Sequence, residues 1–245
     1  MPSAEDHQTR QATVLHVLYL IFNAGYTPGG RSSDATTDLA AEAIRLTRLL
    51  YALQRRDTEV AGLLSLMILT DARRSARETV DGTLIPLAEQ DRTRWNRRQI
   101  DEGVVLITRA LAAGALGPYQ VQAAIAAVHD EASSHAQTDW PQIFALYSVL
   151  ERLAPGPIVT LNRAVAAANV HGPRVGLAVL GTISADARLA HTHRFDSVRA
   201  HLLERAGDYD AARENYRRAI EATTSPAEQR YLNLREANLR QRVDN

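Results

Sequence analysis

The stretch RAHLLERAGDYDAARENYRRAIEATTSPAEQ, residues 199–229, decides the fold. Its landmarks are counted from Gly207: an aromatic residue stands two positions on, alanine five, tyrosine nine and alanine twelve positions on. Small residues at such positions let two antiparallel helices approach each other, and the aromatic side chain fills the space beside them. The spacing therefore predicts a closely packed pair of helices.

This spacing closely resembles the tetratricopeptide repeat, although the repeat normally has its proline slightly before Pro226. Residues 140–155 resemble the second half of an earlier repeat, with Tyr147 eight residues before Pro155. The following stretch, PGPIVTLNRAVAAANVHG, is typical of the first helix of the next repeat. Such units bury their apolar faces only by stacking, so we expect a helical solenoid over residues 140–240.

Apolar residues recur at helical spacing in the rest of the chain as well. The stripes span residues 14–22, 39–53, 60–68, 100–111 and 121–128. Asp57 or Thr58 is expected to cap the third helix, and Asn23 with a left-handed Gly25 to end the first.

The sequence therefore predicts an all-α fold, in which a helical bundle runs into a tetratricopeptide-like α-solenoid. We expect residues 1–135 to form the N-terminal helical region, with a flap at residues 71–95. Residues 136–245 are expected to form the repeat region, and the two regions to make one continuous domain.

The segment at residues 71–95 does not follow the helical pattern. Asp81 and Gly82 stand between short runs with apolar residues, which is a hairpin signal. We therefore expect a small non-helical flap, with a β-hairpin near residues 76–90. Long excursions from a compact domain are usually functional or disordered, and apolar residues such as Ile85 and Trp95 favour burial over disorder.

The charged residues of this segment allow two interpretations. In the structural one, arginine and aspartate side chains pair with each other and the flap fills the groove of the helical array; ion-pair networks on a scaffold are common. In the functional one, the arginines receive an acidic partner surface or ligand, because guanidinium groups are planar multidentate donors. The candidate interaction surface consists of Asp71, Arg73, Arg74, Arg77, Asp91, Arg92 and Trp95.

The composition of the 245 residues narrows the classes of function. Basic and acidic residues balance at 28 each, whereas nucleic-acid binders usually carry a basic surplus, so we expect no direct nucleic-acid binding. The absence of cysteine excludes disulfides, thiolate catalysis and cysteine-bound metals, and suits a reducing cytoplasm. The polar N-terminus is not a signal peptide and the apolar run Val14–Phe22 is too short for a bilayer, so we expect a cytoplasmic protein without membrane contact.

Catalytic motifs are missing from the sequence. It contains no glycine-rich phosphate loop, no H-E-x-x-H and no G-x-S-x-G. His191, His193 and Asp196 lie close together, but the spacing implies no further metal ligand. Asp208 and Asp210 are expected at a helix start rather than as a catalytic carboxylate pair. We therefore expect no enzymatic activity, no metal and no cofactor.

Several stretches taken together resemble one known family. In order they are VLHVLYLIFNAGYTP, LAAEAIRLTRLL, LLSLMILTDARRSAR, DGTLIPLAEQDRTRWNRRQIDEG, GPYQVQAAIAAVHDEA and TDWPQIFALYSVLERLAPGPIVTLNRAVA, followed by the Gly207 repeat. They are similar to the long C-terminal extension of a subgroup of bacterial extracytoplasmic-function RNA polymerase sigma factors. Residues 71–77 and 90–96 are the most specific parts, and Ala24 stands where the family usually has an acidic residue.

The resemblance implies a regulatory extension that binds its own sigma domains, core RNA polymerase or a signal, and adjusts transcription initiation. The domains that bind core polymerase and read the promoter are not in this chain, so DNA contact would belong to them. Two other functions stay open. One is a stand-alone repeat adaptor that binds a peptide or protein in its concave groove, and the other is a small-molecule sensor closed by the flap at residues 71–95.

Overall fold

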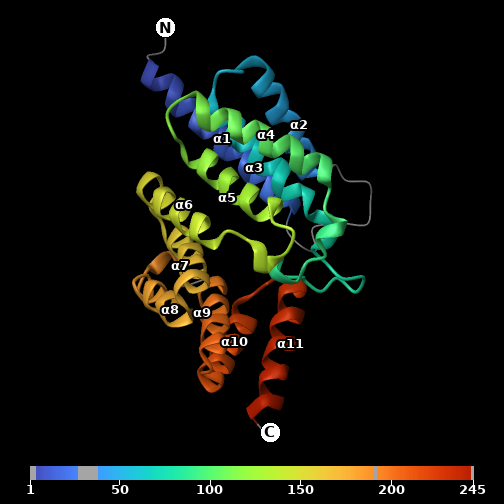
Figure 1. Ribbon diagram of the computed structural model, residues 1–245, viewed down its shortest axis with the longest axis vertical. Helices are drawn as coiled ribbons and strands as arrows, with labels where there is room; N and C mark the ends of the chain where they lie inside the picture. The colour runs from blue at the N-terminus through green and yellow to red at the C-terminus, as the bar shows by residue number, and fades with distance from the viewer. Residues whose placement is uncertain (1–3, 27–37, 190–191, 244–245) are drawn as a thin grey trace. The chain divides into compact units, whose positions relative to one another are not determined.

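The computed structural model describes residues 4–26, 38–189 and 192–243, and most of them are helical (Figure 1). The α-helices are α1 (Ala4–Tyr26), α2 (Leu39–Leu53), α3 (Thr58–Ala72), α4 (Arg97–Ala113), α5 (Pro118–Glu131), α6 (Trp140–Leu153), α7 (Pro157–His171), α8 (Pro173–Gly181), α9 (Arg194–Ala206), α10 (Tyr209–Ala222) and α11 (Pro226–Val243). No strand occurs in these ranges, which confirms the all-α prediction. None of the helices in the same ranges has both the length and the apolar character needed to cross a bilayer.

The chain divides into two compact units. The first contains residues 1–76 and 91–134, and the second contains residues 77–90 and 135–245. The predicted division placed the whole flap in the N-terminal region, whereas here residues 77–90 group with the C-terminal helices.

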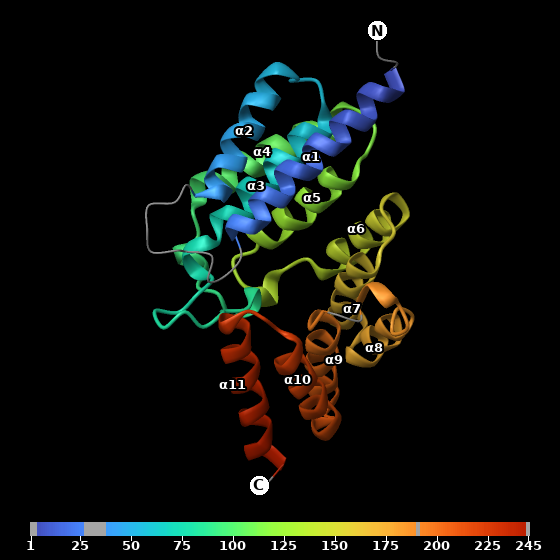
Figure 2. The ribbon, with the colours of Figure 1, turned by 180° about the vertical axis from the view of Figure 1, so that it is seen from behind.

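Helix α3 is the centre of the first unit, with α1, α2, α4 and α5 packed around it (Figure 2). Every residue from Val60 to Leu69 is buried, as a helix without a polar face requires. Asp57 caps α3 as predicted, because its carboxylate accepts hydrogen bonds from the amides of Glu59 and Val60, both at 2.9 Å.

The predicted end of the first helix is wrong. Helix α1 continues through Asn23 and Gly25 to Tyr26, and Gly25 does not have a positive φ. A Cβ atom at Gly25 would lie 2.4 Å from the backbone nitrogen of Ala40, at the start of α2. The glycine therefore permits close helix packing, which overrides its usual role as a helix terminator.

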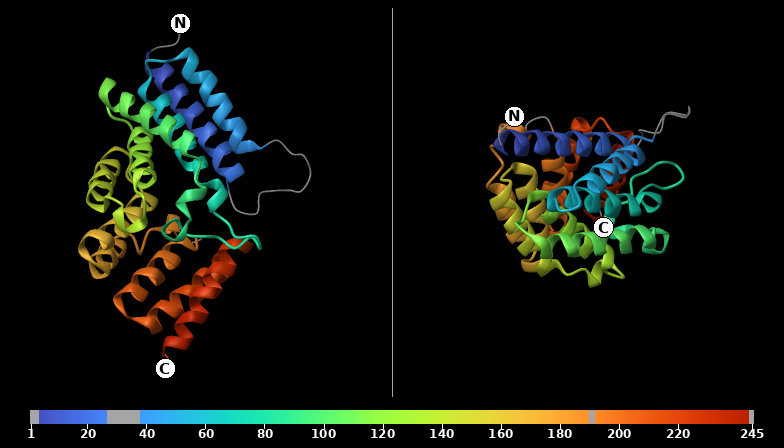
Figure 3. Two further views of the ribbon diagram at one scale, coloured as in Figure 1. Left: turned by 45° about the vertical axis from the view of Figure 1, so that its right-hand side comes forward. Right: turned by 90° about the horizontal axis from the view of Figure 1, so that it is seen from above.

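Helices α6 to α11 form the second unit, in which each helix packs against the next along the chain (Figure 3). Gly207 ends α9 in the left-handed conformation, with φ +83°, and Asp208 caps α10 by accepting from the amide of Ala211. Ala212, Tyr216 and Ala219 are buried. The spacing counted from Gly207 thus corresponds to a helix pair, and the predicted succession of helical repeats is confirmed.

Residues 77–90 form a turn in place of the predicted two-stranded hairpin. Gly82 has φ +77°, and a single antiparallel bridge joins Glu78 to Leu84. Two hydrogen bonds flank this bridge, from the amide of Thr79 to the carbonyl of Thr83 at 3.0 Å and from the amide of Ile85 to the carbonyl of Arg77 at 2.7 Å. The amide of Leu84 points away from the bridge and donates to the carbonyl of Ala227 in α11, at 3.4 Å. The short 3-10 helix Leu87–Glu89 follows.

Candidate functional site

Six of the seven predicted surface residues belong to the first unit. Asp71, Arg73 and Arg74 stand at the end of α3, and Asp91, Arg92 and Trp95 come just before α4. A hydrogen bond of 2.9 Å from the amide of Asn96 to the carbonyl of Ala72 joins the two stretches. The seventh residue, Arg77, belongs to the second unit, where its carbonyl accepts from the amide of Ile85 at 2.7 Å.

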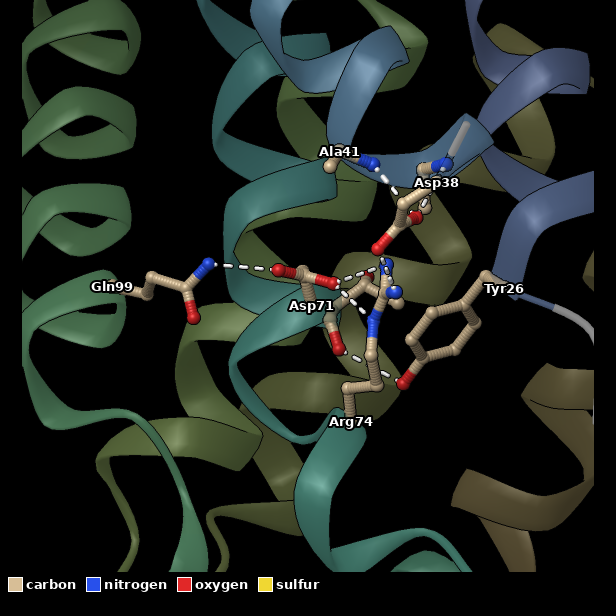
Figure 4. Close-up of polar contacts among 8 residues, drawn as sticks. Tyr26, Asp38, Ala41, Asp71, Arg74 and Gln99 are labelled. Atoms are coloured by element: carbon tan, nitrogen blue, oxygen red, sulfur yellow. Dashed lines mark hydrogen bonds and ion pairs between the residues drawn. The ribbon is translucent and has the colours of Figure 1, made fainter. Parts of the chain in front are cut away.

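Arg74 is the centre of a polar network at the end of α3 (Figure 4). Its guanidinium donates to Asp71 and to Asp38, each at 2.6 Å, and the amide of the Gln99 side chain donates to Asp71 at 2.8 Å. The hydroxyl of Tyr26 donates to the carbonyl of Thr70 at 2.9 Å, next to this network. The network therefore joins the starts or ends of α1, α2, α3 and α4.

Asp38 was not predicted as a site residue. It caps α2, where the amides of Ala40 and Ala41 each donate to its carboxylate at 3.1 Å. Burial raises the pKa of Asp38, but the Ala41 amide and the Arg74 guanidinium outweigh it, so the pKa lies below its usual value. The sequence signal was an aspartate directly before an apolar helix, which marks a cap but does not reveal Arg74 as a partner.

Arg73 and Arg92 form a second cluster with the end of α5. Arg73 lies 3.5 Å from the carboxylate of Asp130, whose side chain is fully buried. Arg92 donates to the carbonyls of His129 and Ala132, each at 2.6 Å, and its guanidinium carbon lies 4.6 Å from the ring centroid of Trp95. Arg92 thus satisfies carbonyl groups at a helix C-terminus, where a positive charge is favoured.

Asp130 was also not predicted as a site residue. Among the described carboxyl groups of the first unit, its pKa departs most from the usual value. Burial raises the pKa of Asp130 to about 6, and the nearby charges of Arg73 and Arg92 oppose this rise. A carboxylate that remains ionised at neutral pH inside the protein requires such partners. The cluster therefore holds a buried charge between α3, α5 and the segment before α4.

The arginines of the candidate surface have partners inside the chain, as the structural interpretation expects. Those partners include residues of α5 and the start of α2, which lie far from the segment in sequence. Asp91 accepts from the amide and hydroxyl of Thr93, which hold its pKa below the usual value. Binding of an outside partner by this surface stays a prediction.

The histidine and aspartate group considered above as a metal site lies partly outside the described residues, since His191 is not among them. His193 forms a 2.7 Å pair with Glu228. Across residues 4–26, 38–189 and 192–243, three histidine, aspartate or glutamate side chains nowhere gather in a way that could hold a metal ion.

A third polar cluster lies in the second unit and was also missed. Glu204 of α9 accepts from the hydroxyl of Tyr216 at 2.8 Å and from the guanidinium of Arg235 at 2.6 Å. Arg235 also lies 3.8 Å from Glu89. A buried tyrosine hydroxyl needs a hydrogen-bond partner. The position of Tyr216 in the repeat spacing was therefore the feature of the sequence that could have indicated this cluster. The cluster connects α9, α10, α11 and residues 77–90.

Comparison with known proteins shows similarities to a family profile, to a curated relative and to a solved structure. Residues 10–111 match the profile of a family of unknown function, DUF6596. An uncharacterised protein of Rhizobium meliloti (strain 1021) is 40% identical over 233 residues, which cover 95% of this chain and 55% of that protein. The chain therefore spans about half the length of this curated relative.

The third similarity is to a solved structure, that of a thermophilic tetratricopeptide-repeat protein of Thermus thermophilus. The TM-score is 0.55 at 14% sequence identity, and the match covers 92% of this chain and 96% of that chain. At this identity the likeness concerns the fold alone. By fold, the chain is thus similar to a tetratricopeptide-repeat protein, and over residues 10–111 its sequence is similar to the family DUF6596.

Proposed function

We propose that this protein is the regulatory, protein-binding extension of an alternative RNA polymerase sigma factor, and that it acts by contact and not by catalysis. The observation that carries the proposal is the succession of stacked helices from α6 to α11, with the Gly207 repeat within it. Helical repeats of this kind present extended surfaces for other proteins. The sigma-factor assignment rests on the resemblance of residues 71–77 and 90–96 described above.

Two further observations support this assignment. The charge of the chain is balanced, as expected if promoter contacts belong to other domains. The Rhizobium relative extends well beyond the matched part, which covers 55% of its length. The remainder leaves room for two small domains of the kind that bind core polymerase and promoter DNA.

The first experiment examines the native polypeptide. An antibody raised against this chain is used for an immunoblot of the source cells and for purification of the protein with its partners. We expect a band well above 26.9 kDa and co-purification of core RNA polymerase. A band at 26.9 kDa without polymerase would contradict the proposal and favour an adaptor or a sensor.

The second experiment tests regulation directly. Transcription from a target promoter is measured with core polymerase and either the whole native polypeptide or the same polypeptide without residues 10–240. We expect deletion to change promoter activity or its response to the signal. Unchanged activity and an unchanged response would refute a regulatory role.

A further inference from the structure

Residues 77–90 lie beside the start of α11 (Figure 3) and are joined to it by hydrogen bonds. Their main chain supplies two of the contacts: the amide of Leu84 donates to the carbonyl of Ala227 at 3.4 Å, and Arg230 donates to the carbonyl of Gly82 at 2.7 Å. Main-chain hydrogen bonds combined with a few side-chain contacts are a common means of recognising extended peptides.

The third contact is an ion pair between Glu89 and Arg235, at 3.8 Å. Arg235 is already held by Glu204 of α9, at 2.6 Å, and its side chain is 25% exposed. Its position therefore does not depend on Glu89. A positioned guanidinium of this kind loses little freedom when a carboxylate binds, which favours recognition of acidic groups.

The charges of the two sides are complementary. Residues 77–90 contain one arginine and three carboxylates, whereas α11 contains four arginines and two glutamates. Opposite net charges favour encounter and determine orientation more than they increase affinity. They indicate an acidic ligand for the α11 side.

The side chains of the segment are only partly buried. No residue from 77 to 90 is fully buried, and Val80 at the turn is completely exposed. The side chain of Glu89 is 55% exposed, and ion pairs in such surroundings contribute little to stability. The segment can therefore leave α11 without withdrawing a fully buried side chain of its own.

We propose that the side of α11 formed by Ala227, Arg230 and Arg235 is a receptor for an extended acidic peptide of a partner protein, and that residues 77–90 occupy it in cis. The inference rests on the proposed protein-binding function and specifies the kind of partner. Because the segment is covalently attached, its effective concentration is high, and a partner must bind more tightly than the segment or bring additional contacts.

The test uses a fluorescein-labelled synthetic peptide of residues 77–90 as the probe. The receptor is the full chain in which residues 78–89 are replaced by a glycine–serine linker of equal length, and binding is measured by fluorescence anisotropy. We expect this chain to bind the peptide at least tenfold more tightly than the unaltered chain does, because its α11 side is unoccupied. Equal binding by the two chains, or no binding up to millimolar peptide, would overturn the proposal.

Two matched peptides test the chemistry of recognition. The Glu89→Gln peptide should bind several-fold more weakly than the original, because it lacks the partner of Arg235. The Glu78→Gln peptide has the same change in charge at the opposite end of the segment and should bind like the original. If both changes weaken binding equally, the attraction is a general charge effect and the assigned contact is wrong.

A milder variant covers the case in which the linker chain does not fold. Glu89→Gln in the full chain changes one exposed side chain, and this chain should bind the unaltered peptide more tightly than the wild-type chain does. No gain in binding would overturn the proposal. Co-purification of RNA polymerase is measured independently, so failure of peptide binding is distinguishable from failure of the sigma-factor assignment.

Discussion

Asp130 illustrates, for a single residue, the cost of a charge inside a helical protein. Its side chain is fully buried, and Arg73 approaches to 3.5 Å. Removing a carboxylate from water costs several kcal/mol, and one ion pair at this distance does not offset that cost. The raised pKa of Asp130, about 6, reflects the free-energy cost of the charged form that its partners do not offset.

The first prediction concerns the pH dependence that follows. The pKa of Asp130 is raised from 3.8 to about 6 in the folded state, so the stabilising contribution of its carboxyl group is complete below pH 3.8 and is lost as the pH rises through 6. Relative to Asp130→Asn, the wild-type chain should lose about 3 kcal/mol of unfolding free energy between pH 3.5 and pH 7. Urea unfolding at several pH values measures this difference.

Asp186→Asn is the matched control. Hydrogen bonds from Arg188 lower the pKa of Asp186 from 3.8 to about 2, so above pH 5 this group is ionised in both the folded and the unfolded chain. Its unfolding curve should run parallel to that of the wild type from pH 5 to pH 7. A parallel curve for Asp130→Asn as well would contradict the prediction.

The sequence identified both residues of the local Arg74–Asp71 pair, but only one residue of each long-range ion pair. The density of charge drew attention to Arg73, Arg74 and Arg92, and each of them has a partner within the chain. Their partners Asp38 and Asp130 lie some 36 to 57 positions away and carry no local sign of the pairing. Pairing of this kind depends on how helices pack, which a periodic pattern does not specify.

Among the structural elements, the turn between α9 and α10 could be predicted from the sequence because it depends only on neighbouring residues. A left-handed glycine ends one helix and an aspartate caps the next, so each requirement is met within two residues. The end of α1 was misjudged because its glycine serves a contact with α2. Local signals predict an element well only where no neighbouring element competes for the same residue.

The second prediction tests the turn. Gly207→Ala should lower the unfolding free energy by about 1–2 kcal/mol, because an L-residue is strained at φ +83°. Gly207→Asn should cost less, since asparagine tolerates this conformation better. Gly181→Ala is the control, because a Cβ atom there meets open space without a positive φ. Urea unfolding compares the three variants, and an equal loss at residues 181 and 207 would contradict the prediction.

For the whole molecule, the sequence predicted the all-α class and the repeat, but not the assignment of residues 77–90 to the second unit. The hairpin signal at Asp81-Gly82 correctly indicated a turn. The contact of Gly82 with Arg230 spans 148 positions, and nothing in the segment itself indicates α11 as its neighbour. The first unit is consequently assembled from two separate stretches of chain.

The third prediction follows from this discontinuous assembly. A protease site inserted between Val80 and Asp81 would be cleaved readily, because Val80 is fully exposed. The fragment with α1 to α3 should then remain bound to the fragment with α4 and α5, since α3 is buried against both. We expect native mass spectrometry to show one species, heavier than the uncut chain only by the water added on cleavage, and two bands after denaturation. Separation of the fragments under native conditions would refute this expectation.

The pairing of Gly82 with Arg230 also has a consequence for the order of events during synthesis. Ribosomes add roughly 5–20 residues per second, so the 148 positions between the two residues take about 7–30 s to translate. During that interval, residues 77–90 have already been synthesised while α11 is still incomplete. A nascent chain therefore presents this acidic segment to the surrounding cell before its own acceptor helix can compete for it.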